Sequence, residues 1–253
     1  MDRCTIRERA RVPRLTQGVI LRARLNEVGG KLTDLLFPPR CVGCGIGGDF
    51  ICATCRGGLP RLSPPFCSTC GRPLIQEESC SSCRRWKLDI DGIRSPFAFQ
   101  GALRQAIHRF KYGGFKALAL PLAQLLAQHL EDKPLAADVL VPVPLHPRRL
   151  RERGYNQSGL LAQELCRLVG LPVAEGTLFR HRNNRAQVKT PDSEERRSNV
   201  LGAFDCRDDK LKGGRILLID DVCTTGATLN SCAIALKKGG AGSIWGLALA
   251  REV

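Results

Sequence analysis

Eight cysteines crowd into residues 41–83 of this 253-residue chain, in four Cys-x-x-Cys pairs. A Cys-x-x-Cys turn presents two sulfurs to one ion, and two such turns complete a tetrahedral Cys4 site. The spacing therefore predicts two metal sites, with sequential pairing as the simplest arrangement: Cys41, Cys44, Cys52 and Cys55, then Cys67, Cys70, Cys80 and Cys83. Zinc is the expected ion. An iron–sulfur cluster, a crossed pairing of the turns, and disulfides or free thiols stay open as alternatives.

The cysteine-rich segment is an internal repeat. Cys-x-x-Cys-Gly opens each half and Cys-x-x-Cys-Arg closes it, which predicts two copies of one small unit, a double zinc ribbon. A Cys4 site has no position open to water, so we expect a structural and not a catalytic metal. The ribbons would either replace the core that so short a segment cannot build, or grip a partner through their neighbouring arginines.

A second chemical signal follows the apolar run 216–219, which leads straight into two carboxylates, Asp220 and Asp221. A turn of small residues comes next and then a helix begins: Thr224, Thr225, Gly226, Ala227 and Thr228. Such a turn can aim backbone N–H groups and hydroxyls at a phosphate. The two acids would repel a bare phosphate, so we expect them to bind the hydroxyls of an attached sugar or to support magnesium. The turn is neither a Walker loop nor a Gly-x-Gly-x-x-Gly turn.

Strand-like and helix-like segments alternate around this turn. Hydrophobic patterning predicts strands at 139–143, 216–219 and 244–249 and helices at 117–130, 158–169 and 228–238. This alternation is typical of an α/β domain with a mostly parallel sheet, expected over residues 90–253. Residues 25–40 are predicted to form a short helix, and residues 1–24 are predicted to form a basic, disordered arm. The polar stretch 181–199 is expected to form a functional lid or to be disordered.

The net charge of the chain indicates which class of partner to expect. The chain has 39 Lys and Arg against 24 Asp and Glu, a formal net charge of +15, which favours phosphate-bearing partners such as small phosphoesters or nucleic acid. A hydrophobic content of 43% excludes wholesale disorder. The longest run without a charged residue, Val222–Leu236, is too short for a membrane span, which needs about 20 residues. An odd cysteine count and an arginine-interrupted N-terminus predict a cytoplasmic protein.

In combination these motifs resemble the ComF family (the ComFC and GntX group), in which a double zinc ribbon precedes a type I phosphoribosyltransferase domain. The resemblance begins at about residue 32. Besides the cysteine repeat and the 215–229 turn, it is carried by Leu36–Gly45, His108–Tyr112, Val141–His146, Arg153–Gln157, Gln187 and Arg196–Phe204.

The resemblance implies a ligand, 5-phosphoribosyl-1-pyrophosphate (PRPP) with magnesium, or a related phosphoribosyl compound. By the family pattern Asp220 and Asp221 would be the catalytic carboxylates that hold the ribose hydroxyls, and 224–228 would cradle the 5′-phosphate. Arg148 and Arg149 would lie where the family binds pyrophosphate. The family further implies a connection with competence, with single-stranded DNA and DNA-uptake proteins as partners. Turnover stays open: a transferase, a PRPP sensor without turnover and a non-catalytic nucleic-acid-binding adaptor are all hypotheses.

Overall fold

The computed structural model describes residues 39–75, 79–181, 202–207 and 210–253. The expected arm at 1–24, nearly all of the 25–40 helix and the expected lid at 181–199 lie outside the described residues, apart from residues 39, 40 and 181 at their edges. Among the described helices, none is both long and apolar enough to cross a membrane.

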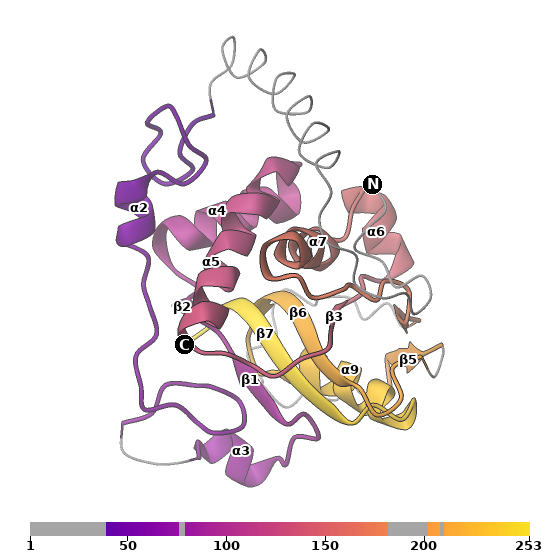
Figure 1. The fold of residues 1–253 in the computed structure, drawn as a ribbon. Coiled ribbons are helices and arrows are strands. Elements are labelled where there is room, and N and C mark those ends of the chain that lie inside the picture. Colours follow the sequence, from indigo (N-terminus) through magenta and orange to yellow (C-terminus); the bar gives the residue numbers. More distant parts are fainter. Residues whose placement is uncertain (1–38, 76–78, 182–201, 208–209) are drawn as a thin grey trace.

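A parallel sheet forms the centre of the molecule (Figure 1). Its strand order is β1 (Gly92–Arg94), β7 (Ser243–Arg251), β6 (Arg215–Cys223) and β3 (Val139–Pro142), and the short β2 (Phe97–Ala98) also pairs with β7. All of these pairs are parallel. A parallel sheet must be covered on both faces, and alternate residues of β6 accordingly enter two different cores.

The helices divide between the two faces. On one face α4 (Gly101–Tyr112), α5 (Ala119–Asp132) and α7 (Gln157–Val169) pack against Leu217 and Ile219. On the other, α9 (Ala227–Lys238) packs against Ile216 and Leu218. The 3-10 turn η1 (Lys116–Leu118) precedes α5, α6 (Pro147–Arg153) follows β3, and β4 (Leu178–Arg180) pairs antiparallel with β5 (Phe204–Cys206). The α/β class predicted from the sequence is confirmed.

Most predicted elements occur at the predicted places, with one difference that bears on the site. The strand predicted at 216–219 runs on to Cys223, because its ladder with β7 continues through the pairs Asp220–Ala248 and Cys223–Arg251. The two carboxylates therefore lie inside the strand and not after it. Helix α4 was not predicted as an element, although its buried residues have helical spacing: Leu103, Ala106, Ile107 and Phe110.

The ribbon repeat is confirmed in three dimensions. Matching antiparallel bridges, Arg40–Gly47 and Phe66–Pro73, close the two knuckles, and a short helix completes each half, α2 (Ala53–Gly57) and α3 (Ser81–Arg85). The two halves lie at different places on the α/β domain (Figure 1). The first shares the core of α4 and α5 through Val42, Ile51 and Leu59.

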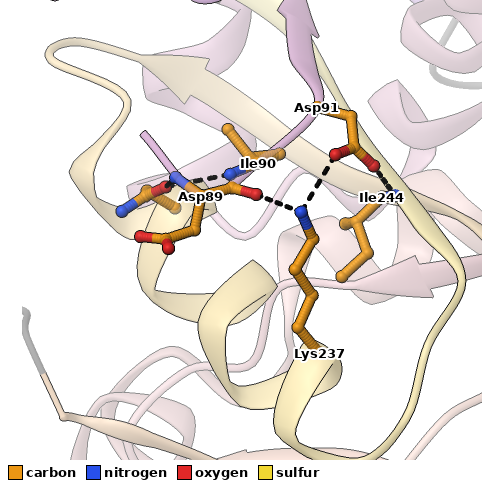
Figure 2. A network of polar contacts seen from close by, with 6 residues as sticks. Asp89, Ile90, Asp91, Lys237 and Ile244 are labelled. Carbon is orange, nitrogen blue, oxygen red and sulfur yellow. Dashed lines mark hydrogen bonds and ion pairs between the residues drawn. The ribbon is translucent and has the colours of Figure 1, made fainter. Parts of the chain in front are cut away.

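The segment between the second ribbon and β1 is fixed to both α9 and β7 (Figure 2). Lys237 donates from Nζ to the Asp89 carbonyl and pairs with Asp91 Oδ1 at 2.9 Å, while Asp91 Oδ2 accepts from the Ile244 N–H at 2.6 Å. From α9, Asn230 Oδ1 accepts from the Asp89 N–H at 2.7 Å. This network fixes where the ribbon chain enters the sheet.

Candidate functional site

The eight ribbon cysteines form two groups of four. Within each group the sulfurs lie within 4.8 Å of one another, in the sequential sets Cys41, Cys44, Cys52, Cys55 and Cys67, Cys70, Cys80, Cys83. The simplest pairing predicted from the sequence is thereby confirmed over the crossed one. Four sulfurs this close match the donor set of a tetrahedral zinc site.

Backbone N–H groups support thiolates at both centres. The Cys52 amide donates to Cys41 Sγ and the Cys55 amide to Cys52 Sγ, each at 3.4 Å. The second centre repeats the pattern with the Cys83 amide and Cys80 Sγ, again at 3.4 Å. A hydrogen bond from Cys83 lowers the pKa of Cys70 to about 4, against the effect of burial. Because zinc binds thiolates, these donors fit the metal.

The two centres differ in exposure. In the first, Cys44 is exposed and Cys52 and Cys55 are half-buried. In the second, Cys67, Cys70 and Cys80 are all buried. The second centre is consequently the better shielded from water and chelators.

Asp220 lies near the carboxyl end of β6 and is almost fully buried, with 8% of its surface exposed. Its Oδ1 accepts from the Ser158 hydroxyl at 3.0 Å and from the Asp221 N–H at 2.9 Å. Burial, together with the adjacent charge of Asp221, raises the pKa of Asp220 to about 7. Such a perturbed acid in a polar cluster is typical of a functional site.

Asp221 is buried beside a lysine from another element. Lys111, near the end of α4, places Nζ 2.9 Å from Asp221 Oδ1. The other carboxylate oxygen, Oδ2, is buried and has no hydrogen-bond partner. An unsatisfied buried acceptor is unfavourable unless something donates to it, so this oxygen is free to accept a hydrogen bond from a group outside the described residues.

After β6 a turn of residues 224–226 leads into α9, so Ala227 and Thr228 of the predicted turn lie in the first turn of that helix. Gly226 adopts φ +82°, a backbone conformation that favours glycine, and a Cβ there would stand only 2.8 Å from Ile93 Cδ1, so the end of the Ile93 side chain would have to move. Thr225 Oγ1 accepts from the Ala227 N–H at 3.3 Å. The half-buried Thr224 and Thr228 flank the start of α9, where unpaired N–H groups favour an anion.

A basic cavity of about 510 Å³ lies next to the carboxylates, since Lys111 is in its wall. The wall also holds Arg149, Arg153, Glu152 and Tyr112. Of the two arginines expected at a pyrophosphate site, the structure brings Arg149 to this cavity and turns Arg148 aside to an exposed ion pair with Glu152 at 2.8 Å. Lys111 thus lies in the wall of this cavity together with Arg149 and pairs with Asp221, which is buried and does not itself line the cavity.

Lys111 and Ser158 have no role in the sequence-based predictions, whereas Arg153 belongs to the arginine run 148–153 that was expected to supply the charge of a pyrophosphate site. The signal for Lys111 was its place in the His108–Tyr112 motif, but only the fold carries α4 to the end of β6. His146, at the end of the Val141–His146 motif, caps α6, with its Nδ1 accepting from the Arg148 N–H at 3.1 Å.

Comparison with known proteins adds family relationships. Residues 32–84 match the family model "Double zinc ribbon domain". The chain is 32% identical to competence protein ComFC of Bacillus subtilis, covering 80% of this chain and 84% of that protein. Competence protein F of Haemophilus influenzae is 31% identical, covering 83% and 97%. The DNA utilization protein YhgH of Salmonella typhi is 29% identical, covering 77% and 87%.

Solved structures resemble only part of the fold. The allosteric regulatory enzyme of purine biosynthesis matches 56% of this chain and 29% of its own, at 17% identity and a TM-score of 0.37. A purine phosphoribosyltransferase of Pyrococcus horikoshii matches 52% and 72%, at 20% identity and a TM-score of 0.31. Scores this low establish no shared activity. The cysteine centres and the edge of β6 are therefore the features from which function must be argued.

Proposed function

Since the chain belongs to the ComF family of competence proteins, we propose that it binds PRPP at the carboxyl end of β6. The observation that carries this proposal is Asp221 Oδ2, a buried acceptor without a hydrogen-bond partner. It lies in β6, which the 224–226 turn connects to the N-terminus of α9. A sugar hydroxyl would satisfy that oxygen, and a phosphate on the same sugar would reach the turn.

Each part of the ligand has a counterpart in the site. Asp220 and Asp221 accept hydrogen bonds from the ribose hydroxyls, and the 224–228 turn takes the 5′-phosphate. Arg149, Arg153 and Lys111 face the pyrophosphate in the basic cavity. Arg148 contributes long-range charge and no direct contact, because its guanidinium is paired with Glu152.

Magnesium would enter with the ligand. In the described part of the chain the only groups of three or more metal-ligating side chains are the two cysteine centres, so the pyrophosphate oxygens must supply most of its coordination. The ion would neutralise pyrophosphate charge. The side chains of this protein hold the sugar and orient the pyrophosphate.

The test is a calorimetric titration of PRPP with magnesium into the zinc-loaded protein. We expect wild-type binding that Asp220→Asn/Asp221→Asn weakens at least about tenfold, since each hydrogen bond to a charged group contributes about 1.5–3 kcal/mol. Zinc content should stay unchanged. The control is Asp138→Asn, which removes a carboxylate at the opposite end of β6, where it pairs with Arg215 at 2.6 Å. Equal PRPP affinity in wild type and double variant would overturn the site.

Pyrophosphate release from bound PRPP then separates a transferase from a sensor. A transferase releases pyrophosphate when it is supplied with its acceptor, whereas a sensor binds PRPP and leaves it intact under every acceptor tested. The sensor and the transferase would bind PRPP with the same side chains. The calorimetric titration therefore tests the binding proposal, whichever of the two the protein is.

We further propose that this activity serves DNA uptake in the cytoplasm. The names of the relatives, competence proteins and a DNA utilization protein, support this role. The zinc centres need reduced thiols, which supports a reducing compartment. Single-stranded DNA and DNA-uptake proteins are the partners that this role requires.

A further inference from the structure

Arg251, the last residue of β7, carries the largest fully buried side chain in the described part of the molecule. Its surface is 0% exposed. Its Nη1 donates to the Thr224 carbonyl at 3.2 Å, and its Nη2 donates to the Cys70 carbonyl. One guanidinium thus joins the 224–228 turn, called the phosphate turn below, to the second cysteine centre.

This buried charge has no carboxylate partner among the described residues, where none of the ion pairs includes Arg251. Its Nε is also buried without a hydrogen-bond partner. An uncompensated buried cation is strongly destabilising, so a negative group must lie nearby.

The second cysteine centre is that group. Zinc with four thiolates carries a net charge of about −2. Arg94 approaches the same centre, with Nη1 donating to the Ser68 carbonyl at 3.1 Å. Burial lowers the pKa of Arg94, while the Cys67 and Cys70 charges raise it. At the first centre, Arg56 instead donates to Gln124 of α5 at 3.1 Å.

The backbone ties the same parts together. The Ile93 N–H of β1 donates to the Thr69 carbonyl of the second knuckle at 2.7 Å. A Cβ at Gly71 would stand 2.2 Å from the Ile93 carbonyl oxygen, and Ile93 also abuts Gly226 of the phosphate turn. The second knuckle, β1 and the turn are therefore one packed unit.

We propose that Arg251 is a positioning residue through which zinc in the second centre holds the phosphate turn in its binding conformation. The zinc-bound thiolates compensate the guanidinium charge, and the guanidinium holds the Thr224 carbonyl. Loss of the second zinc leaves the cation uncompensated and releases the turn, while loss of the first zinc does not. This inference rests on the proposed PRPP site.

Matched ligand variants test it in the full chain. Cys83→Ser and Cys55→Ser change equivalent cysteines of the two repeats. Both should lose about one zinc, measured by metal analysis. We expect Cys83→Ser to weaken PRPP binding at least about tenfold, and Cys55→Ser to change it less than about twofold, because only the second centre adjoins Arg251. Equal effects of the two variants on PRPP affinity would overturn the coupling.

Zinc release supplies a second readout that does not depend on PRPP. In the Cys55→Ser background only the second zinc remains, and Arg251→Gln should speed its release to a chelator at least about tenfold, with Arg251→Lys intermediate. An unchanged release rate overturns the role of Arg251. If wild-type protein fails to bind PRPP while Arg251→Gln still speeds zinc release, the proposed function is wrong and the contact of Arg251 with the centre stands.

Reciprocity covers the case in which the Arg251 variants do not fold. Two coupled sites must change each other's affinity equally, so saturating PRPP should raise the zinc affinity of Cys55→Ser, measured by chelator competition at equilibrium, by the same factor by which zinc strengthens PRPP binding. A zinc affinity that PRPP leaves unchanged, in a protein that binds PRPP, overturns the coupling.

Discussion

Two neighbouring carboxylates have different surroundings in this molecule. Asp220 is satisfied by Ser158 and a backbone amide, whereas Asp221 has a lysine on one oxygen and nothing on the other. Keeping both acids buried side by side lowers stability, and natural proteins retain such arrangements where they serve a ligand.

The loss of stability from burying Asp220 should make the free energy of unfolding depend on pH. The pKa of Asp220 is raised to about 7, so the folded protein holds this proton more tightly than the unfolded chain. Its contribution to stability is full below pH 3.8, the ordinary value, and is lost as pH rises through about 7. Asparagine cannot ionise, so Asp220→Asn should gain on the order of 2 kcal/mol over wild type between about pH 6 and 8.5.

Urea unfolding at both pH values measures this change. Asp138→Asn is the control: the hydrogen bonds from Arg215 lower the pKa of Asp138 to about 2, so that group stays ionised throughout and its variant should show no such pH dependence. A stability difference for Asp220→Asn that is the same at the two pH values would contradict the burial argument.

Residue types predicted part of the site well. The cysteine groups and the pair Asp220 and Asp221 were readable, because each signal lies within a few residues of sequence. Lys111 beside Asp221 and Arg251 beside Thr224 were not readable, since each contact joins elements that meet only in the folded sheet. Burial of an arginine, moreover, has no signature in a local pattern.

At the scale of elements, the two knuckles have the same sequence pattern and different surroundings. Each carries glycine after its second cysteine, with φ +78° at Gly45 and +70° at Gly71. Gly45 has no atom within 4 Å of a Cβ, whereas Gly71 is pressed against β1. The repeat in the sequence shows that both knuckles carry this glycine, but only the packing distinguishes the surroundings of Gly71 from those of Gly45.

Alanine substitutions should separate conformation from packing. Gly45→Ala should lower the free energy of unfolding by about 1 kcal/mol, the penalty for a left-handed residue with a side chain. Gly71→Ala adds a collision with backbone and should cost on the order of 3 kcal/mol or more. Chemical unfolding of the zinc-loaded variants measures both, and equal losses would mean that the second knuckle does not bear on β1 as described.

Element boundaries show why a strand was predicted too short. The hydrophobic pattern placed the end of the strand at residue 219 because two acids follow. The ladder with β7 consists of backbone hydrogen bonds, which do not depend on side-chain polarity, and it continues to Cys223. The polar residues are tolerated in the strand because they occur at its carboxyl end, where open α/β sheets bind ligands.

At the scale of the whole molecule, the zinc ribbons do not form a detached module. The first shares a core with the helices on one face, and the second is fixed to the edge strand and the phosphate turn. The sequence predicted the ribbons and the α/β domain as separate units, and it carried no information on their docking, which depends on contacts between distant segments.

The net charge of +15 belongs to this scale as well. If single-stranded DNA is a partner, its affinity should fall at least about tenfold between about 50 and 200 mM salt, because phosphate contacts release counterions. Fluorescence anisotropy with a labelled oligonucleotide measures this, and PRPP added as a competitor shows whether the basic cavity is shared. Affinity that does not change with salt would argue against electrostatic binding.

Strand order also sets a schedule for biosynthesis. β7 follows all the other described strands in sequence and yet it lies in the interior of the sheet, between β1 and β6. On the ribosome, the ribbons emerge before the sheet and can collect zinc early, but among the described strands β1 has no partner until β7 is translated. The newly made chain therefore keeps an open sheet until β7 is available, and Arg251 is the residue that completes this strand.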